Sequence, residues 1–249
     1  MQLEELSLFI AQRFIARTDV MAVQRSNGSY APIQEGFTLG AIEDHILGKR
    51  RLGHYLLNND HRCRLAAFDL DFEEGGVGIP RCPEDEDPQP WSPAEALRDQ
   101  ASPLRPRAIL YIRSLAESLA EIAAVRKKVV SDVIIGFSGN KGLHVYLLFQ
   151  KLVSAQVAQS VTHDIILEFN QPFSGKSEPA FSPKRGVNFW SARSYPGLTI
   201  ECFPKQGKKT RYGNLMRLPY GTHAKSGQQG FFIDRNAPMD ELRPLLELP

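Results

Sequence analysis

The sequence predicts an α/β protein whose centre is a sheet formed in the order β-α-β-β-α-β, preceded by a smaller α/β module. Three observations predict this fold. Apolar residues recur at helical spacing in residues 107–128 and 154–169. Four other apolar segments, short and bounded by Gly, Pro or polar residues, are typical of strands. A chain of 249 residues, 42% of them hydrophobic, can bury a core of this size.

The first 60 residues are expected to form the smaller module. Its clearest turn signal is Ser-Asn-Gly-Ser between two strand-like segments, which is typical of a hairpin. In chain order we expect a helix over residues 2–16, a hairpin of residues 20–24 and 30–34, a helix over 38–47 and a strand over 52–57.

Residues 61–235 are expected to form the core, with residues 236–249 as a C-terminal tail of the same single domain. The expected elements are a strand over 65–72, a helix over 107–128, strands over 133–137 and 143–149, a helix over 154–169 and a strand over 198–203. This is the order of the ferredoxin-like or RNA-recognition-motif (RRM) fold, which belongs to the α+β class. There the first strand lies between the third and the fourth.

Two segments carry no clear periodicity. Residues 73–106 are rich in Gly, Pro and acidic side chains, which predicts an exposed, mobile insertion. Residues 171–197 are expected to form a long loop before the last strand.

Asp69 and Asp71 are the first candidates for chemistry. They stand two residues apart in a predicted strand, so both carboxylates project from the same face. Neighbouring carboxylates repel each other unless a cation lies between them, and oxygen ligands suit Mg²⁺ or Mn²⁺. A solvated pair on an edge strand is the alternative, but the apolar approach of Leu65–Phe68 favours a buried central strand.

Phe137-Ser-Gly-Asn-Lys-Gly-Leu-His144 connects two predicted strands. Ser138, Asn140 and Lys141 can donate hydrogen bonds to phosphate oxygens, and glycines let the backbone approach a ligand closely. His144 would begin the third strand, beside the first. The alternative is an ordinary hairpin with a surface lysine and an unremarkable histidine.

Three further side chains lie later in the chain. Glu201 stands in the predicted fourth strand, next to the first, where a third carboxylate could reach metal ions held by Asp69 and Asp71. A structural glutamate is the alternative, with Asp234 as the next candidate ligand. Arg217 and His223 could contact phosphate, sugar or base, or could be surface side chains on a loop.

Basic and aromatic residues cluster around the last predicted strand. Cations neutralise phosphates, and aromatic rings stack on unpaired bases. A solvated charged face is the alternative, and the net charge of +2 does not decide between them. The candidate nucleic-acid contacts are Lys184, Arg185, Trp190, Arg193, Lys205, Lys208, Lys209 and Arg211.

With these residues in place, the sequence resembles the archaeo-eukaryotic primase superfamily, and most of all the primase-polymerases of prokaryotic mobile elements and defence systems. The resemblance rests on motifs spread over residues 15–235: Gly53-His-Tyr55, Phe68-Asp-Leu-Asp71, the 137–144 motif, Ile200-Glu-Cys-Phe-Pro-Lys-Gln206 and the segment 214–227. Many members carry Asp where this chain has Glu201.

The resemblance implies a template-directed nucleotidyltransferase, a DNA primase or a primer-extending polymerase. It implies two Mg²⁺ or Mn²⁺ ions held by Asp69, Asp71 and Glu201. It implies partners in nucleoside triphosphates and in single-stranded or primer-template DNA, with RNA as another template and a helicase, nuclease or other replication or defence protein as a further partner. The nucleotide contacts would be Ser138, Asn140, Lys141, His144, Arg217 and His223.

Three alternatives stay open: an end-joining repair polymerase of the same superfamily, a non-catalytic RRM-like nucleic-acid-binding module, and a metal-dependent phosphoesterase. An RRM-like binding module would place aromatic residues where this chain has Asp69, Asp71 and Glu201. The N-terminus lacks the pattern of a signal peptide and no segment approaches 18 apolar residues, so we expect a cytoplasmic protein without a membrane partner.

Overall fold

A computed structural model describes residues 2–75, 91–126, 128–171, 181–183, 188–192, 197–206 and 211–247. The first elements form the N-terminal module: α1 (Leu3–Arg13), β1 (Met21–Gln24), β2 (Tyr30–Ile33), α2 (Leu39–Ile46) and β3 (Leu52–Tyr55). Each of them falls within its predicted range. None of the helices in the described part of the chain has the length and hydrophobicity needed to cross a bilayer.

In the described residues, the core follows the predicted order, with one additional helix and four additional strands. Its elements are β4 (Arg62–Phe72), α3 (Pro93–Arg98), α4 (Arg105–Ala124), β5 (Val130–Phe137), β6 (Gly142–Ser154), α5 (Ala155–Phe169), β7 (Phe181–Pro183), β8 (Phe189–Ala192), β9 (Leu198–Phe203), β10 (Leu215–Arg217) and β11 (Phe231–Phe232).

Within the described part of the chain, the long sheet has seven strands in the order β11-β5-β6-β4-β9-β8-β7. Its centre, β5-β6-β4-β9, is the predicted ferredoxin-like arrangement, with β4 between β6 and β9 and both pairings antiparallel. A second sheet of four strands, β10-β3-β1-β2, belongs to the N-terminal module. The late strand β10 joins that module by pairing with β3, so segments far apart in the sequence share one sheet.

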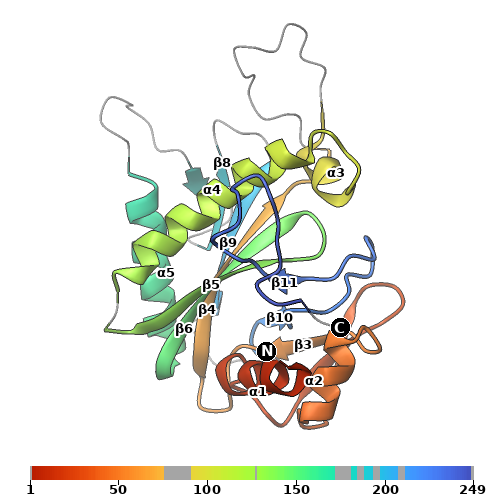
Figure 1. Cartoon of the computed structure of the whole chain (residues 1–249). Helices are drawn as coiled ribbons and strands as arrows, with labels where there is room; N and C mark the ends of the chain where they lie inside the picture. The colour runs from red at the N-terminus through yellow and green to blue at the C-terminus, as the bar shows by residue number, and fades with distance from the viewer. Residues whose placement is uncertain are drawn as a thin grey trace, which may run out of the picture.

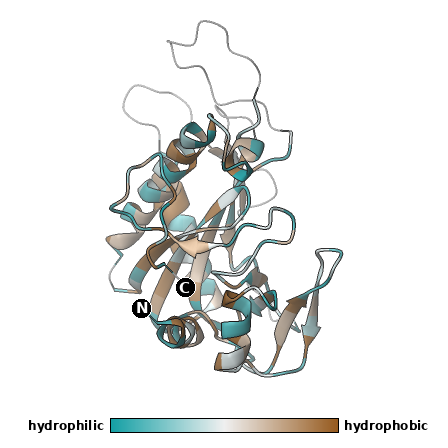
Figure 2. Ribbon diagram, turned by 45° about the vertical axis from the view of Figure 1, so that its right-hand side comes forward, coloured by the Kyte–Doolittle hydropathy of each residue, from teal (hydrophilic) through white to brown (hydrophobic). Residues whose placement is uncertain are grey.

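The two faces of the long sheet pack against different layers, as the alternation of side chains along each strand requires. On one face, Phe68 and Leu70 of β4 are buried beneath α4 and α5 (Figure 1). On the other, Leu65 and Ala67 of β4 are buried against α1, α2 and β3. Brown ribbon in Figure 2 runs along the central strands, which therefore carry the apolar interior between the two layers.

The N-terminal module thus covers only part of its face of the sheet. Leu65 and Ala67 are buried, whereas Asp69 and Asp71, further along the same face of β4, remain partly exposed. The functional candidates therefore begin where the packing of the module ends.

The tail is held by one buried side chain. Arg113 of α4 has no exposed surface, and its guanidinium donates hydrogen bonds to main-chain carbonyls near the end of the chain. The acceptors are the carbonyl oxygens of Asp234 (3.3 Å), Arg235 (3.1 Å), Pro238 (2.6 Å) and Glu241 (2.9 Å).

Two sequence-based expectations are wrong in the described residues. The second half of the predicted mobile insertion forms α3, in which Ala94 and Leu97 are fully buried. The predicted loop over residues 171–197 contains β7 and β8, which extend the sheet beyond β9. The first half of the insertion, residues 76–90, lies outside the described residues.

Two buried histidines in the N-terminal module predict acid sensitivity. Burial lowers the pKa of both His45 and His54 to about 4, whereas an unfolded histidine keeps its ordinary pKa near 6.5. The unfolded chain therefore binds more protons between these values, and stability falls as the pH drops from about 6.5 towards 4. We expect each histidine to cost about 2 kcal/mol of unfolding free energy between pH 7.5 and pH 5.

Urea unfolding at these two pH values measures the loss. The variant His54→Gln should show a shallower pH dependence than the parent chain, since it lacks a buried histidine that takes up a proton on unfolding. Equal stability of the parent protein at both pH values would contradict the expectation.

Candidate active site

The strand register brings four predicted residues together. Asp69 of β4 lies directly opposite His144 of β6 on one side and Glu201 of β9 on the other. Asp71 follows two residues later, opposite Gly142 and therefore on the same face. Ile200 and Cys202, which alternate with Glu201 along β9, are buried beneath the helices on the opposite face.

A pocket of about 210 Å³ opens above these residues. Its floor is the sheet and its wall is the β10 segment of the N-terminal module. Seven predicted residues line it, namely Asp69, Asp71, Ser138, Asn140, His144, Arg217 and His223, together with Phe203, Leu215 and Met216. Lys141 and Glu201 do not line it.

The two aspartates are paired with different cations. Nζ of Lys141 lies 3.3 Å from Oδ2 of Asp71, and Nε2 of His144 lies 3.3 Å from Oδ1 of Asp69. Burial and the like charge of Asp69 nevertheless raise the pKa of Asp71 to about 6. Burial alone would lower the pKa of His144, but the charge of Asp69 and Asp71 outweighs it, so that pKa is raised.

Glu201 is turned away from the pocket. Its Oε2 accepts a hydrogen bond of 2.6 Å from Nζ of Lys205, which also lies 4.6 Å from the centre of the Phe203 ring. Lys205, predicted as a nucleic-acid contact, is therefore the partner of the predicted third metal ligand. Asp234, the next candidate ligand, pairs with Arg243 at 2.9 Å and does not line the pocket.

A divalent cation fits the aspartate pair. Oδ1 of Asp69 is buried and accepts no well-aligned hydrogen bond from a described residue, and burial together with the charge of Asp69 raises the pKa of Asp71, an effect that a bound cation would offset. Glu201 fits such a site only after its carboxylate leaves Lys205. Accordingly, the described residues contain no group of three or more His, Cys, Asp or Glu side chains arranged to hold a metal.

The geometry of the loop in the 137–144 motif requires glycine at two positions. Gly139 has a φ of +77°, a conformation that side-chain-bearing residues rarely adopt. A Cβ on Gly142 would collide with Oδ1 of Asp71 and with the carbonyl of Leu70. Ser138 Oγ accepts hydrogen bonds of 3.3 Å from the backbone N–H groups of both Asn140 and Gly142, which holds the turn closed over the aspartates.

Helix α3 contacts this loop, which sequence reasoning missed. Nε of Arg98 donates to Oδ1 of Asn140 at 2.7 Å, and its guanidinium also pairs with Glu74. The carbonyl of Arg98 accepts a hydrogen bond from the side chain of Gln228. The helix thereby ties the loop to the segment that carries His223. An alternation of Pro and acidic residues gives no signal for such a contact.

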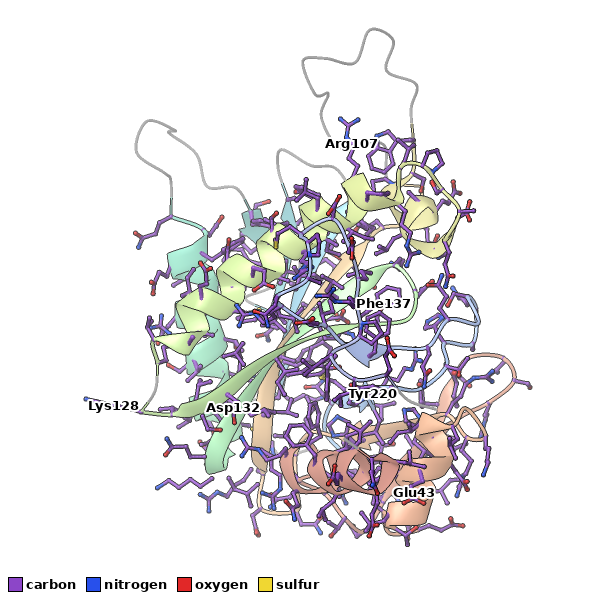
Figure 3. All side chains as sticks on the ribbon, in the orientation of Figure 1. Glu43, Arg107, Lys128, Asp132, Phe137 and Tyr220 are labelled. Atoms are coloured by element: carbon purple, nitrogen blue, oxygen red, sulfur yellow. The ribbon has the colours of Figure 1, made fainter. Side chains whose placement is uncertain are left out.

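Arg217 and His223 both reach the pocket from the late segment. Arg217 donates to the carbonyl of Ser138 at 3.0 Å and to that of Gly221, so its guanidinium joins the 137–144 loop to its own segment. Burial and the nearby charge of Arg217 lower the pKa of His223 to about 4, which keeps that ring neutral at pH 7. In Figure 3, Phe137 at the end of β5 and Tyr220 mark the junction between loop and segment, and both line a smaller cavity behind His144.

The predicted nucleic-acid contacts divide into three groups. Trp190 is 5% exposed and packs in the core beneath the helices, so the prediction that it stacks on a base is wrong. Lys205 lies at the site, and Arg211 lies 5.0 Å from the centre of the Tyr212 ring. The others lie outside the described residues: Lys184, Arg185, Arg193, Lys208 and Lys209.

Comparison with known proteins identifies the family of the chain. No curated protein matches it. Among solved structures, the polymerase domain of ligase D from Mycobacterium tuberculosis in complex with DNA aligns with 90% of this chain and 76% of that chain, at 11% identity and a TM-score of 0.44. The family model of the archaeo-eukaryotic primase domain of TOTE conflict systems matches residues 10–177, more than half of the sequence. The chain therefore belongs to the archaeo-eukaryotic primase domain family of TOTE conflict systems.

Proposed function

We propose that this chain joins nucleotides to the 3′-hydroxyl of a nucleic-acid strand under the direction of a template, as a primase, a primer-extending polymerase or both. One observation carries the proposal. The register of three adjacent strands sets Asp69 between His144 and Glu201, with Asp71 beside it at the floor of a pocket. Carboxylates next to phosphate-binding donors are the side chains that nucleotidyl transfer requires.

In the proposed reaction, a 3′-hydroxyl attacks the α-phosphate of a nucleoside triphosphate and pyrophosphate leaves. Asp69 and Asp71 would hold Mg²⁺ or Mn²⁺, with Glu201 completing the set once Lys205 is displaced. Two such ions supply charge neutralisation at the attacking and leaving oxygens.

The remaining pocket side chains would bind the triphosphate. Arg217 in the pocket and Lys141 beside it supply positive charge, and His144 can donate a hydrogen bond through Nε2. Ser138, Asn140 and His223 add neutral donors along the same wall. Single-stranded or primer-template DNA is the proposed polymer partner, with an RNA template as the second choice for the assay.

A primer-extension assay tests this function. A labelled primer-template duplex, and separately the unprimed template, is incubated with dNTPs or NTPs and with Mg²⁺ or Mn²⁺. Extension with release of pyrophosphate supports the proposal, and products from the unprimed template identify a primase. Release of inorganic phosphate alone would indicate a phosphoesterase, and binding without incorporation would indicate a nucleic-acid-binding module.

The contact between α3 and the loop predicts an effect on nucleotide binding. Replacing Arg98 with Gln removes the charged donor that orients Asn140. We expect the KM for the incoming nucleotide to rise about tenfold, because a hydrogen bond from a charged group contributes ~1.5–3 kcal/mol. Steady-state extension kinetics at varied nucleotide concentration measure this change.

The matched control is Arg126→Gln, which breaks another Arg–Glu pair, the one between Arg126 and Glu168 at 2.8 Å. That variant should keep the parent KM. Equal KM values for both variants would show that α3 does not position the loop.

A further inference from the structure

The geometry points to Tyr146 as a positioning residue that fixes the tautomer of His144. Both side chains project from β6 onto the pocket face of the sheet, because they stand two residues apart. The hydroxyl of Tyr146 lies 2.7 Å from Nδ1 of His144. This inference deepens the proposed function and, in its catalytic part, depends on it.

While His144 is neutral, the hydroxyl of Tyr146 is the donor in this contact. Tyr146 is 1% exposed, and burial raises its pKa, so the hydroxyl keeps its proton. A buried proton needs an acceptor, and among the described residues Nδ1 of His144 is the hydrogen-bond partner found for this oxygen. A neutral His144 therefore carries its own proton on Nε2.

The other side of the ring favours the same tautomer. Nε2 of His144 faces Oδ1 of Asp69 at 3.3 Å. An ionised carboxylate only accepts hydrogen bonds, so an unprotonated Nε2 would set two lone pairs against each other. Tyr146 and Asp69 thus select one tautomer from opposite ends of the ring.

Packing holds Tyr146 in the orientation that this contact needs. Its ring lies edge-on to Phe14, which directly follows α1, and to Phe232 of β11, with centroids 5.0 Å and 6.2 Å away. These neighbours come from the N-terminal module and from the edge of the long sheet. The packing between the two layers therefore fixes the ring of Tyr146 and, through its hydrogen bond, the N–H group at Nε2 of His144. This N–H group stays directed into the pocket, where a phosphate oxygen would bind.

The test compares Tyr146→Phe with the parent chain. This substitution removes one oxygen and keeps the packed ring. Nitrogen-15 NMR of protein labelled at histidine distinguishes protonated from unprotonated ring nitrogens, and a His144→Gln sample identifies the His144 signals. We expect a protonated Nε2 in the parent protein under conditions where the ring is neutral, and a mixture of tautomers in Tyr146→Phe.

Kinetics give the second readout. In primer extension, kcat of Tyr146→Phe should fall about tenfold, since removal of a group that orients a functional histidine costs about 10–100-fold. The KM for primer-template and the melting temperature should change little. Tyr146→Phe added to His144→Gln should have no further effect, because Tyr146 acts through that ring. Tyr55→Phe, which removes a hydroxyl from a tyrosine that stacks on Tyr212 in the N-terminal module, is the control.

A protonated Nδ1 in the parent protein would overturn the inference, and so would an unchanged tautomer in Tyr146→Phe. An additive loss in the double variant would show that Tyr146 acts independently of His144 and would overturn it as well. If the parent chain incorporates no nucleotide, the proposed function fails, while the NMR comparison still decides whether Tyr146 sets the tautomer.

Discussion

Replacing Asp69 and Asp71 together with asparagine is expected to lower nucleotide incorporation on the order of 1000-fold or more. Both carboxylates face the pocket, and the double variant would lose the charge that attracts divalent ions while keeping the side-chain volume. Stability should not fall, because the two carboxylates repel each other and the pKa of Asp71 is raised to about 6. Primer extension and thermal unfolding measure the two effects.

Asp132→Asn is the matched control for this pair. Asp132 lies on β5, which β6 separates from β4, is largely exposed and pairs with Arg13 at 2.8 Å. Its replacement should leave incorporation unchanged. Retention of more than a few per cent of activity in the Asp69/Asp71 variant would mean that the reaction does not depend on this carboxylate pair.

The second large effect is expected at Glu201. Glu201→Gln should lower kcat about 100-fold if Glu201 is the third metal ligand, because the amide keeps the shape of the side chain but loses its charge. The melting temperature should change little, since the ion pair with Lys205 is partly exposed and such pairs contribute about 0–1 kcal/mol.

The variant Lys205→Gln distinguishes metal binding by Glu201 from a simpler role in which Glu201 only pairs with Lys205. If Glu201 serves only to anchor Lys205, both variants break the same pair and should show the same small loss. If Glu201 binds metal, Lys205→Gln frees the carboxylate and should lower the Mg²⁺ or Mn²⁺ concentration needed for half-maximal extension. Equal effects of the two substitutions would remove Glu201 from the metal site.

The central strands and the candidate site were predictable because one physical rule governs both. Alternation along β4 sends Phe68 and Leu70 to the helices and Asp69 and Asp71 to the other face. Once the strand order was predicted, the same rule set His144 and Glu201 beside Asp69. These statements need only sequence periodicity and a known connection pattern, and the structure confirms the arrangement.

The parts that sequence could not predict depend on long-range contacts. Helix α3 is six residues long and follows a Pro-rich segment, so its stability comes from burying Leu97 and from the contact of Arg98 with Asn140. Strands β7 and β8 have only three and four residues. They form because β8 pairs with β9 and β7 pairs with β8. Trp190 is an aromatic residue of the kind that stacks on bases, but its position in β8 directs it into the core.

The pairing of Lys205 with Glu201 could not be predicted from the sequence either. A run of basic residues after a strand predicts phosphate contacts, but it does not indicate that one lysine turns back four residues onto a carboxylate. Likewise, the spacing of His144 and Tyr146 predicts a shared face and not a hydrogen bond.

The hydrogen bonds from Arg113 to main-chain carbonyls limit how far the C-terminal end can be shortened without loss of stability. Four main-chain oxygens between residues 234 and 241 accept hydrogen bonds from a guanidinium that has no access to solvent, and the carboxylate of Glu117 lies 3.7 Å from its Nε. Removing the last segment would take away these four acceptors, and since a hydrogen bond to a charged group contributes ~1.5–3 kcal/mol, the loss would be a large part of a typical folding free energy. Although every proposed chemical group precedes residue 224, a catalytically minimal fragment is therefore not a structurally minimal one.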